Sequence, residues 1–311
     1  MSRARVVLIL AALSAVAVIA GCSDNGVRPV PDSTSEQSTI AGTIAAAPDL
    51  LNDGLYDTET PANLAAALRG ASPAGSTTPV EIEPYFFWRT IARRMPSFEF
   101  AFADTDTTGL PTTAIVTVRR HFTGTLNIVP RDPVNPDLPD THNIVRKPLD
   151  DLWVRRFLMK RVRLAPGDHA AWKIAAATAV EVTSKDATTA ITSIRVQSGP
   201  TDTTLTDPAA FIHLRRVLRF APDDPVTLTV TTPRTDDVVL LYHHVERERF
   251  ENHGDGTYTR TFTAGSLQGW RHFGVNALSH GTLYDDIAPY DSKAWIFPYV
   301  IVGGPDVDYL P

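Results

Sequence analysis

The sequence contains very little cysteine and no clustered positive charge. Cys22 is the only cysteine in 311 residues, so no disulfide can form within the chain. The 29 lysines and arginines are outnumbered by 35 aspartates and glutamates, and they form no basic block. Because contacts with a phosphate backbone need clustered Lys and Arg, we do not expect nucleic acid as a partner. The fold must be stabilised mainly by burial of apolar side chains.

The motifs that mark common catalytic sites are also missing. The chain has no G-x-S-x-G turn, no phosphate-binding glycine loop and no H-x-x-x-H pair. Its one cysteine lies near the N-terminus, which leaves no cysteine nucleophile in the rest of the chain. We therefore predict no catalytic residues and no cofactor. The sequence favours a protein without enzymatic activity.

The N-terminus has the three parts of an export signal. Arg3 and Arg5 form a short basic segment, and residues 6–20 follow without any charge. These fifteen residues are fewer than the roughly 20 that a membrane-spanning helix needs, but they suit the apolar segment of a signal peptide. The segment ends in Ile-Ala-Gly-Cys at residues 19–22. Small residues before a cysteine resemble the lipobox of bacterial lipoproteins, and the alternative is an ordinary secretory signal with a chance cysteine.

The resemblance to lipoproteins implies that residues 1–21 are removed and that Cys22 carries the lipid, including an N-acyl chain such as palmitate. Several acyl chains, at about 0.8 kcal/mol per buried methylene, make such anchoring stable. Because Ser23 and not aspartate follows the cysteine, the resemblance further implies the outer membrane. The mature chain would carry 27 basic and 35 acidic side chains, a net charge of −8. Residues 22–49 are rich in Ser, Asp and Pro, which predicts a flexible tether.

Residues 50–200 are predicted to form an α+β domain in which helices pack on a curved antiparallel sheet. Thr60 and Gly70 suit the start and the end of a first helix. A second helix is predicted after Pro84 from the spacing of Trp88 and Ile91, with a strand as the alternative. Apolar and polar residues alternate after that, which indicates strands with one buried face. The alternating apolar residues include Phe98, Phe100, Phe102, Ala114, Val116, Val118, Trp172, Ile174, Val180 and Val182.

The sequence KPLDD at 147–151, followed by an Arg-rich strand and then by Trp172, resembles the nuclear transport factor two-like superfamily of cone-shaped folds. The resemblance implies a pocket inside the cone. Four polar residues are candidates to line it, namely Arg119, His121, Asp150 and Asp151. Alternation places Arg119 and His121 on the polar face of their strand, and this face is equally suited to contact solvent. No residue pair among the four has a spacing tied to a specific reaction.

Residues 208–304 are predicted to form a second domain, an all-β sandwich, after a Thr- and Asp-rich boundary at 201–207. Short strands, among them those predicted at 225–231 and 257–262, are separated by turn residues, which favours this architecture. The sequence DGTYTRTF at 255–262, followed by Gly269-Trp270, resembles bacterial immunoglobulin-like domains. The resemblance implies the sandwich but says little about function. Because there is no cysteine pair, the domain departs from the disulfide-linked antibody type.

Two groups of residues in the second domain are of types that bind metals. His243 and His244 are adjacent, so in a strand they point to opposite faces and do not share an ion easily. Asp285, Asp286 and Asp291 lie in one loop but lack the spacing of a calcium-binding loop. We therefore predict surface or interface histidines, solvated loop carboxylates and no metal site.

Taken together, the anchor, the tether and the sandwich predict a cell-envelope lipoprotein that acts as a non-enzymatic binding or assembly module. Its expected partners are the membrane, through the lipid, and an envelope protein or polysaccharide. The alternative is a small-molecule-binding protein or enzyme that uses a pocket in the N-terminal domain. A deep cavity that combines apolar groups with His121 or Asp151 would favour the alternative.

Overall fold

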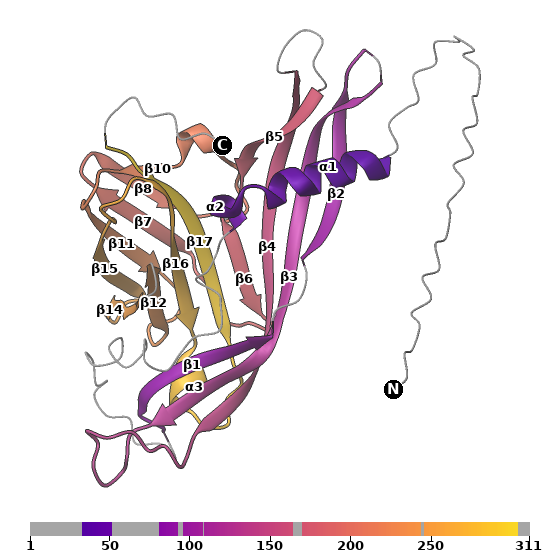
Figure 1. Ribbon diagram of the computed structural model, residues 1–311. Helices are drawn as coiled ribbons and strands as arrows, with labels where there is room; N and C mark the ends of the chain where they lie inside the picture. The colour runs from indigo at the N-terminus through magenta and orange to yellow at the C-terminus, as the bar shows by residue number, and fades with distance from the viewer. Residues whose placement is uncertain are drawn as a thin grey trace, which may run out of the picture. The chain divides into compact units, whose positions relative to one another are not determined.

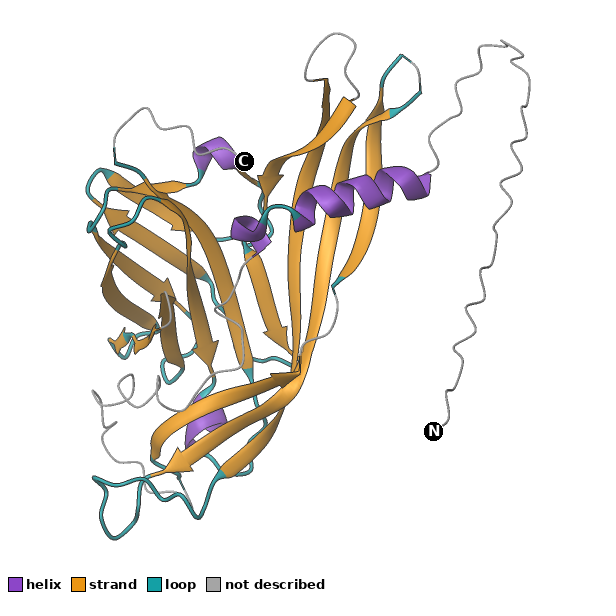
Figure 2. Cartoon of the chain, viewed as in Figure 1, coloured by secondary structure: helices purple, strands orange, loops and turns teal. Residues whose placement is uncertain are grey.

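The computed structural model describes residues 33–51, 81–92, 96–107, 109–163, 170–243 and 246–303. This part of the chain is mostly β-strand (Figure 2). Its helices are α1 (Ser33–Ala45), α2 (Pro48–Leu51), the 3-10 turn η3 (Leu214–Arg216) and α3 (His280–Tyr284). Within the described residues, no helix combines the length and the apolar character needed to span a membrane. The export signal, Cys22 and the helix predicted at 60–70 lie outside the described residues.

Strands of very different length form two sheets, and nearly all neighbouring strands are antiparallel. In chain order the strands are β1 (Pro84–Ala92), β2 (Ser97–Thr105), β3 (Pro111–Pro130), β4 (Val145–Arg163), β5 (Ala170–Ala177), β6 (Val180–Ser184), β7 (Ser193–Ser198), β8 (Thr201–Leu205), β9 (Ile212–His213), β10 (Leu218–Phe220), β11 (Pro225–Thr231), β12 (Val238–His243), β13 (Glu246–Arg249), β14 (Glu251–Asn252), β15 (Thr257–Thr263), β16 (Gly269–Leu278) and β17 (Ser292–Ile301).

The larger sheet has 12 strands among the described residues, and its main path is β1-β3-β4-β6-β17-β16-β12-β13. β3 and β4 are its longest strands, with 20 and 19 residues, and they pair from Thr113↔Lys160 to Ile128↔Val145. Figure 1 shows both strands bending along their length, so that the sheet curls. The alternation predicted for β3 is confirmed, because Ala114, Val116 and Val118 are buried while the residues between them are partly exposed.

The predicted α+β domain is wrong, because the described N-terminal half is built from strands and has no layer of helices on a sheet. The helix predicted after Pro84 is strand β1, which pairs with β3. Its aromatic and β-branched residues favour a strand, and Phe87, Arg89 and Ile91 are buried with a period of two. The Trp88 to Ile91 spacing therefore reflects no helical face.

Residues 33–45, which composition places in the flexible tether, form helix α1 instead. Ile40 and Ile44 are fully buried and lie one helical turn apart. The Glu36 carboxylate accepts a hydrogen bond from Trp172 Nε1 (2.5 Å) and lies 3.3 Å from the guanidinium of Arg161. These contacts hold α1 against the end of β4 and β5, and composition alone does not reveal them.

The smaller sheet has the order β14-β15-β11-β7-β8, and it forms a sandwich with part of the larger sheet. The strands predicted at 225–231 and 257–262 are confirmed as β11 and β15. Residues 201–205, within the predicted boundary, pair with β7 as strand β8. The opposing layer consists of β12, β16 and β17, which belong to the same 12-stranded sheet as β1 and β3. We call the apolar layer between the sheets the sandwich core; its buried members include Val196, Leu228, Leu241, Phe262, Phe273, Trp295 and Phe297.

The opposite face of the larger sheet carries a second buried layer, which we call the inner core. Strand β12 shows the division most clearly, because Leu240 and Tyr242 belong to the inner core while Val239 and Leu241 belong to the sandwich core. Helices α1 and α2 contribute to the inner core as well. Its buried members include Ile40, Ile44, Leu50, Phe87, Val116, Phe122, Trp153, Phe157, Trp172, Leu240, Tyr242, Tyr290 and Ile296.

Candidate functional site

The smaller sheet covers β12, β16 and β17 on one face, and the same face of β3, β4 and β6 lies beside the sandwich. Cross-strand pairing aligns side chains across this region, with His121 opposite Leu152, Leu152 opposite Thr183, and Thr183 opposite Lys293. These residues face away from the inner core, and Leu152 is 42% exposed. A single exposed leucine is common on protein surfaces, so the case for a site here depends on the titratable side chains and the hollow beside Leu152.

A groove of about 470 Å³ lies on this face, and we call it the outer groove. His121 Nε2 and Asp150 Oδ1 are hydrogen-bonded to each other across β3 and β4. Both side chains remain accessible, with exposed fractions of 42% and 38%. The groove therefore combines the apolar side chain of Leu152 with polar side chains that can donate and accept hydrogen bonds. The residues that line it are His121, Asp150, Leu152, Thr183, Ser184 and Lys185.

The hydroxyl groups of the outer groove already have partners. Thr183 Oγ1 accepts a hydrogen bond from Lys293 Nζ (2.7 Å), and Ser184 Oγ accepts one from the backbone N–H of Ser292 (2.9 Å). Ser184 is also buried. Within the described part of the chain, the exposed Lys185 side chain makes no hydrogen bond or ion pair. The groove can thus bind a ligand through ammonium, imidazole and carboxylate groups, but neither hydroxyl lies against His121 as an activated nucleophile would.

The four residues predicted from sequence fall into different environments. His121 and Asp150 meet in the outer groove. Arg119 lies on the same face but pairs with Glu99 of β2. Asp151 points to the opposite face, where it is fully buried and accepts a hydrogen bond from Tyr290 OH (3.0 Å). The alternation of strand residues requires this split between neighbouring aspartates.

The inner core contains charged groups that sequence reasoning missed. Arg89 is 1% exposed and donates to Tyr242 OH (2.9 Å), which in turn donates to Asn276 Oδ1 (3.3 Å). Asn276 Nδ2 donates to Ser292 Oγ (2.7 Å). Burial raises the pKa of Tyr242, so its hydroxyl keeps its proton. This chain links β1, β12, β16 and β17 through polar groups inside an otherwise apolar layer.

Further cations lie within the same layer. Arg155 is also buried and donates to the carbonyl oxygens of Thr178 (3.0 Å) and Leu50. Lys147 Nζ donates to the carbonyl oxygens of Gly281 (2.7 Å) and Asp285 (2.5 Å). Burial lowers the pKa of Lys147 to about 8, against the opposing effect of nearby carboxylates. These cations tie β4 to the segments around α2 and α3, which is a structural role.

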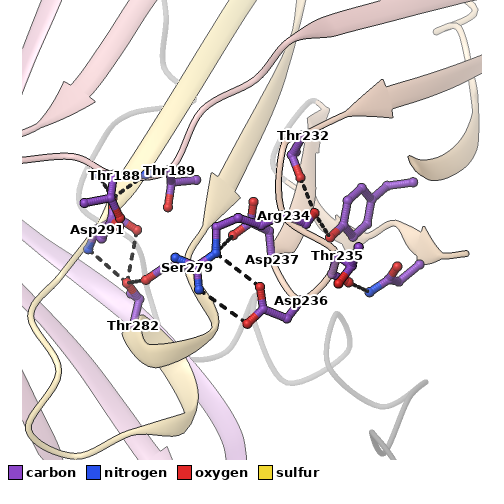
Figure 3. Close-up of polar contacts among 12 residues, drawn as sticks. Thr188, Thr189, Thr232, Arg234, Thr235, Asp236, Asp237, Ser279, Thr282 and Asp291 are labelled. Atoms are coloured by element: carbon purple, nitrogen blue, oxygen red, sulfur yellow. Dashed lines mark hydrogen bonds and ion pairs between the residues drawn. The ribbon is translucent and has the colours of Figure 1, made fainter. Parts of the chain in front are cut away.

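The loop aspartates act as hydrogen-bond acceptors, as Figure 3 shows for Asp291. The Asp291 carboxylate accepts hydrogen bonds from the backbone N–H groups of Thr188 (3.0 Å) and Thr189 (3.1 Å) and from the hydroxyl of Thr188. Asp285 Oδ1 accepts from the backbone N–H groups of Ile287 and Ala288. The described residues contain no group of three or more His, Cys, Asp or Glu side chains arranged to hold a metal ion.

Two further histidines, His243 and His280, have structural partners. His243 is buried in the sandwich core, where its Nε2 lies 3.1 Å from Tyr299 OH. The side chain of His244 lies outside the described residues. His280 Nε2 lies 3.0 Å from Glu81 Oε1. Of His121, His243 and His280, it is His121 that lies in a groove with other accessible polar side chains.

No protein-family model, no curated protein and no solved structure matches this chain. Its function is therefore inferred from two features only: the residues near its N-terminus and the geometry of the described part. In the described part, the outer groove combines accessibility with chemically diverse side chains.

Proposed function

We propose that this chain is a cell-envelope lipoprotein that acts as a non-enzymatic binding or assembly module, anchored through Cys22, with the outer membrane as its site. The basic, apolar and small-residue segments before Cys22 support the anchor. Lipid attachment at Cys22 keeps the module at a membrane surface without a spanning helix. The partner is an envelope protein or polysaccharide.

The outer groove is the single observation that supports binding. It is open to solvent, because its His121 and Asp150 side chains are about two-fifths exposed. Small ligands are usually enclosed in pockets that bury most of their surface, whereas an open groove suits a segment of a larger partner. The groove offers such a segment an apolar contact at Leu152 and a cation at Lys185.

The second candidate is an enzyme that uses the His121–Asp150 pair for proton transfer. The pair has the composition of a general acid–base unit, and it is accessible. Against this reading, the two groove hydroxyls are held by Lys293 and Ser292. Asp151 is on the opposite face of β4 and cannot join them. We therefore place binding first.

Site-specific photocrosslinking in intact cells tests the binding proposal. A photoreactive residue at Leu152 should give a discrete adduct with an envelope component, because that position lies in the outer groove. The matched control is Leu267, which is 72% exposed and lies in a loop away from the groove. The Leu152 adduct should disappear when Lys185→Glu is added. Equal labelling from both positions, or an adduct that survives Lys185→Glu, would show that the groove does not bind the partner.

Lipid attachment is tested separately. Metabolic labelling with a palmitate analogue should mark the wild-type chain and leave Cys22→Ser unlabelled and unprocessed. A Cys22→Ser chain that is still labelled would contradict the anchor while leaving the groove proposal intact.

A further inference from the structure

Strand β2 forms an edge of the 12-stranded sheet, and no other described strand covers its outer backbone edge. It pairs with β3 from Ser97↔Arg119 to Thr105↔Pro111. Within the described residues no second strand pairs with it, and Figure 1 shows it as the outermost strand beside β3. An open edge presents N–H and C=O groups that can pair with a strand from another chain.

β2 lacks the features that usually protect such an edge. Its sequence SFEFAFADT contains no proline and no lysine, and its one charge before Asp104, on Glu99, is paired with Arg119. Phe98, Phe100 and Phe102 form a stacked ladder with ring centroids 6.2 and 6.4 Å apart. The three rings are only half-buried against the inner core. The edge thus offers both a backbone template and partly exposed aromatic surface.

We propose that β2 pairs antiparallel with β2 of a second copy of this chain, about a two-fold axis at Ala101. This register places Phe100 of one copy opposite Phe102 of the other, and Glu99 opposite Ala103. No like charges face each other, and a small side chain lies on the axis. The proposal goes beyond the binding function above and does not depend on the outer groove.

Three properties favour a second copy over an unrelated strand. The residues from Glu99 to Ala103 are complementary to themselves in this register, on both faces of the strand. Cross-strand aromatic pairs stabilise antiparallel strands, and the register continues the phenylalanine ladder from one copy into the next. A two-fold interface also uses both open β2 edges, which closes the assembly at a dimer. Asp104 has a positive φ of 51°, which limits regular pairing to the residues before it.

Cysteine crosslinking tests the register directly. Ala101→Cys is made in the full chain, and the wild-type chain, whose one cysteine is Cys22, is oxidised beside it to report any crosslink through that residue. Directly opposed residues in antiparallel strands have Cα atoms roughly 4.5–5.5 Å apart, which fits a disulfide. Mild oxidation should therefore link Ala101→Cys into a dimer. Ala103→Cys is the matched control, since two copies of residue 103 would be separated by about four residues along the strand, roughly 13 Å.

The Ala101→Lys variant is a second test of the dimer and does not depend on the folding of the cysteine variants. It places two ammonium groups on the axis, so it should convert the dimer to a monomer in sedimentation velocity while circular dichroism stays unchanged. Three results would overturn the proposal: a wild-type chain that is monomeric at every concentration, a dimer that Ala101→Lys does not affect, or equal crosslinking from positions 101 and 103. A dimer that Ala101→Lys does not affect, or equal crosslinking from both positions, would mean that the dimer forms through another surface. A chain that stays monomeric would mean that the β2 edge does not pair with a second copy.

Discussion

The inner core and the sandwich core lie on opposite faces of the same strands, yet they contain different kinds of side chain. The inner core includes Arg89, Asp151 and Arg155, each at most 1% exposed, and a chain of hydrogen bonds through Tyr242. The sandwich core consists mainly of aliphatic and aromatic side chains, with His243 bonded to a tyrosine hydroxyl at its margin. An apolar core side chain can be replaced by another of similar volume with little loss of stability. A buried charged group, in contrast, lowers stability unless its hydrogen-bond and ionic partners are in place.

This difference explains why the two cores should respond differently to mutation. Removing one partner from a buried polar network leaves another buried group unsatisfied, and the penalty is larger than the worth of the bond. The accessible side chains of the outer groove, His121, Asp150, Leu152 and Lys185, belong to neither core, so they should be replaceable at little cost in stability.

The largest difference in stability is expected between variants of the neighbouring aspartates Asp150 and Asp151 of β4. Asp151→Ala removes a fully buried carboxylate and its bond with Tyr290, so the free energy of unfolding should fall by about 3–5 kcal/mol. Asp150→Ala removes an accessible carboxylate on the other face, and the loss should stay below about 1 kcal/mol. Urea unfolding of both variants measures the difference. Equal losses would contradict the division between inner core and groove.

Stability should also depend on pH through His272, which lies on the same face of β16 as Asn276. Burial lowers the pKa of His272 to about 3, with a further contribution from Arg155. Between its ordinary pKa of 6.5 and about 3, the unfolded chain binds the proton and the folded chain does not. Stability should therefore fall as the pH drops through this range, with a slope approaching about 1.4 kcal/mol per pH unit. His272→Gln should flatten the slope measured by denaturation at several pH values.

A smaller pH dependence of stability, opposite in sign to that of His272, is expected at the end of the sandwich. The Asp237 side chain is buried 3.5 Å from Arg234, whose guanidinium also bonds Asp236 (Figure 3). Burial raises the pKa of Asp237 to about 6. Because the folded chain holds this proton more tightly, the contribution is complete below about pH 4 and is lost as the pH rises through 6.

Asp237→Asn removes the cost of burying this charge. The variant should be more stable than wild type at pH 7.5 by on the order of 1–3 kcal/mol and equal to it near pH 4. Asp236→Asn serves as the control, since a hydrogen bond with Arg234 lowers the pKa of the half-exposed Asp236. A loss of stability in Asp237→Asn at pH 7.5 would mean that the carboxylate is needed in its charged form.

The sequence predicts the individual strands well where one face is apolar and the other polar. Strands β11 and β15 have this pattern, with threonines on one face, and their predicted ranges agree with the structure. The pattern is weaker in β1, where Tyr-Phe-Phe-Trp has no polar residue to show the period. Neighbouring residues of a strand point to opposite faces, so alternation alone already indicates that Asp150 and Asp151 do not line the same pocket.

Long-range pairing limits what the sequence predicts about the site. Arg89 and Tyr242 are 153 residues apart and meet only because β1 and β12 contribute to one curled sheet. Helix α1 likewise depends on Trp172 and Arg161, which are distant in sequence. The sequence predicts His121 and Asp150 as candidates, but the groove they share with Lys185 depends on the position of β6 beside β4. Such contacts follow from strand order, which local periodicity does not determine.

Chemical modification of histidines in intact cells tests the central claim, that the outer groove is occupied by an envelope partner, most directly. His121 should react slowly with diethyl pyrocarbonate in the cell envelope and quickly in the purified protein, because a bound partner covers the groove. His142, which is exposed in the turn before β4, should react equally in both preparations. Mass spectrometry of the two peptides gives the ratio. A His121 that is equally reactive in cells and in the purified protein would contradict the claim.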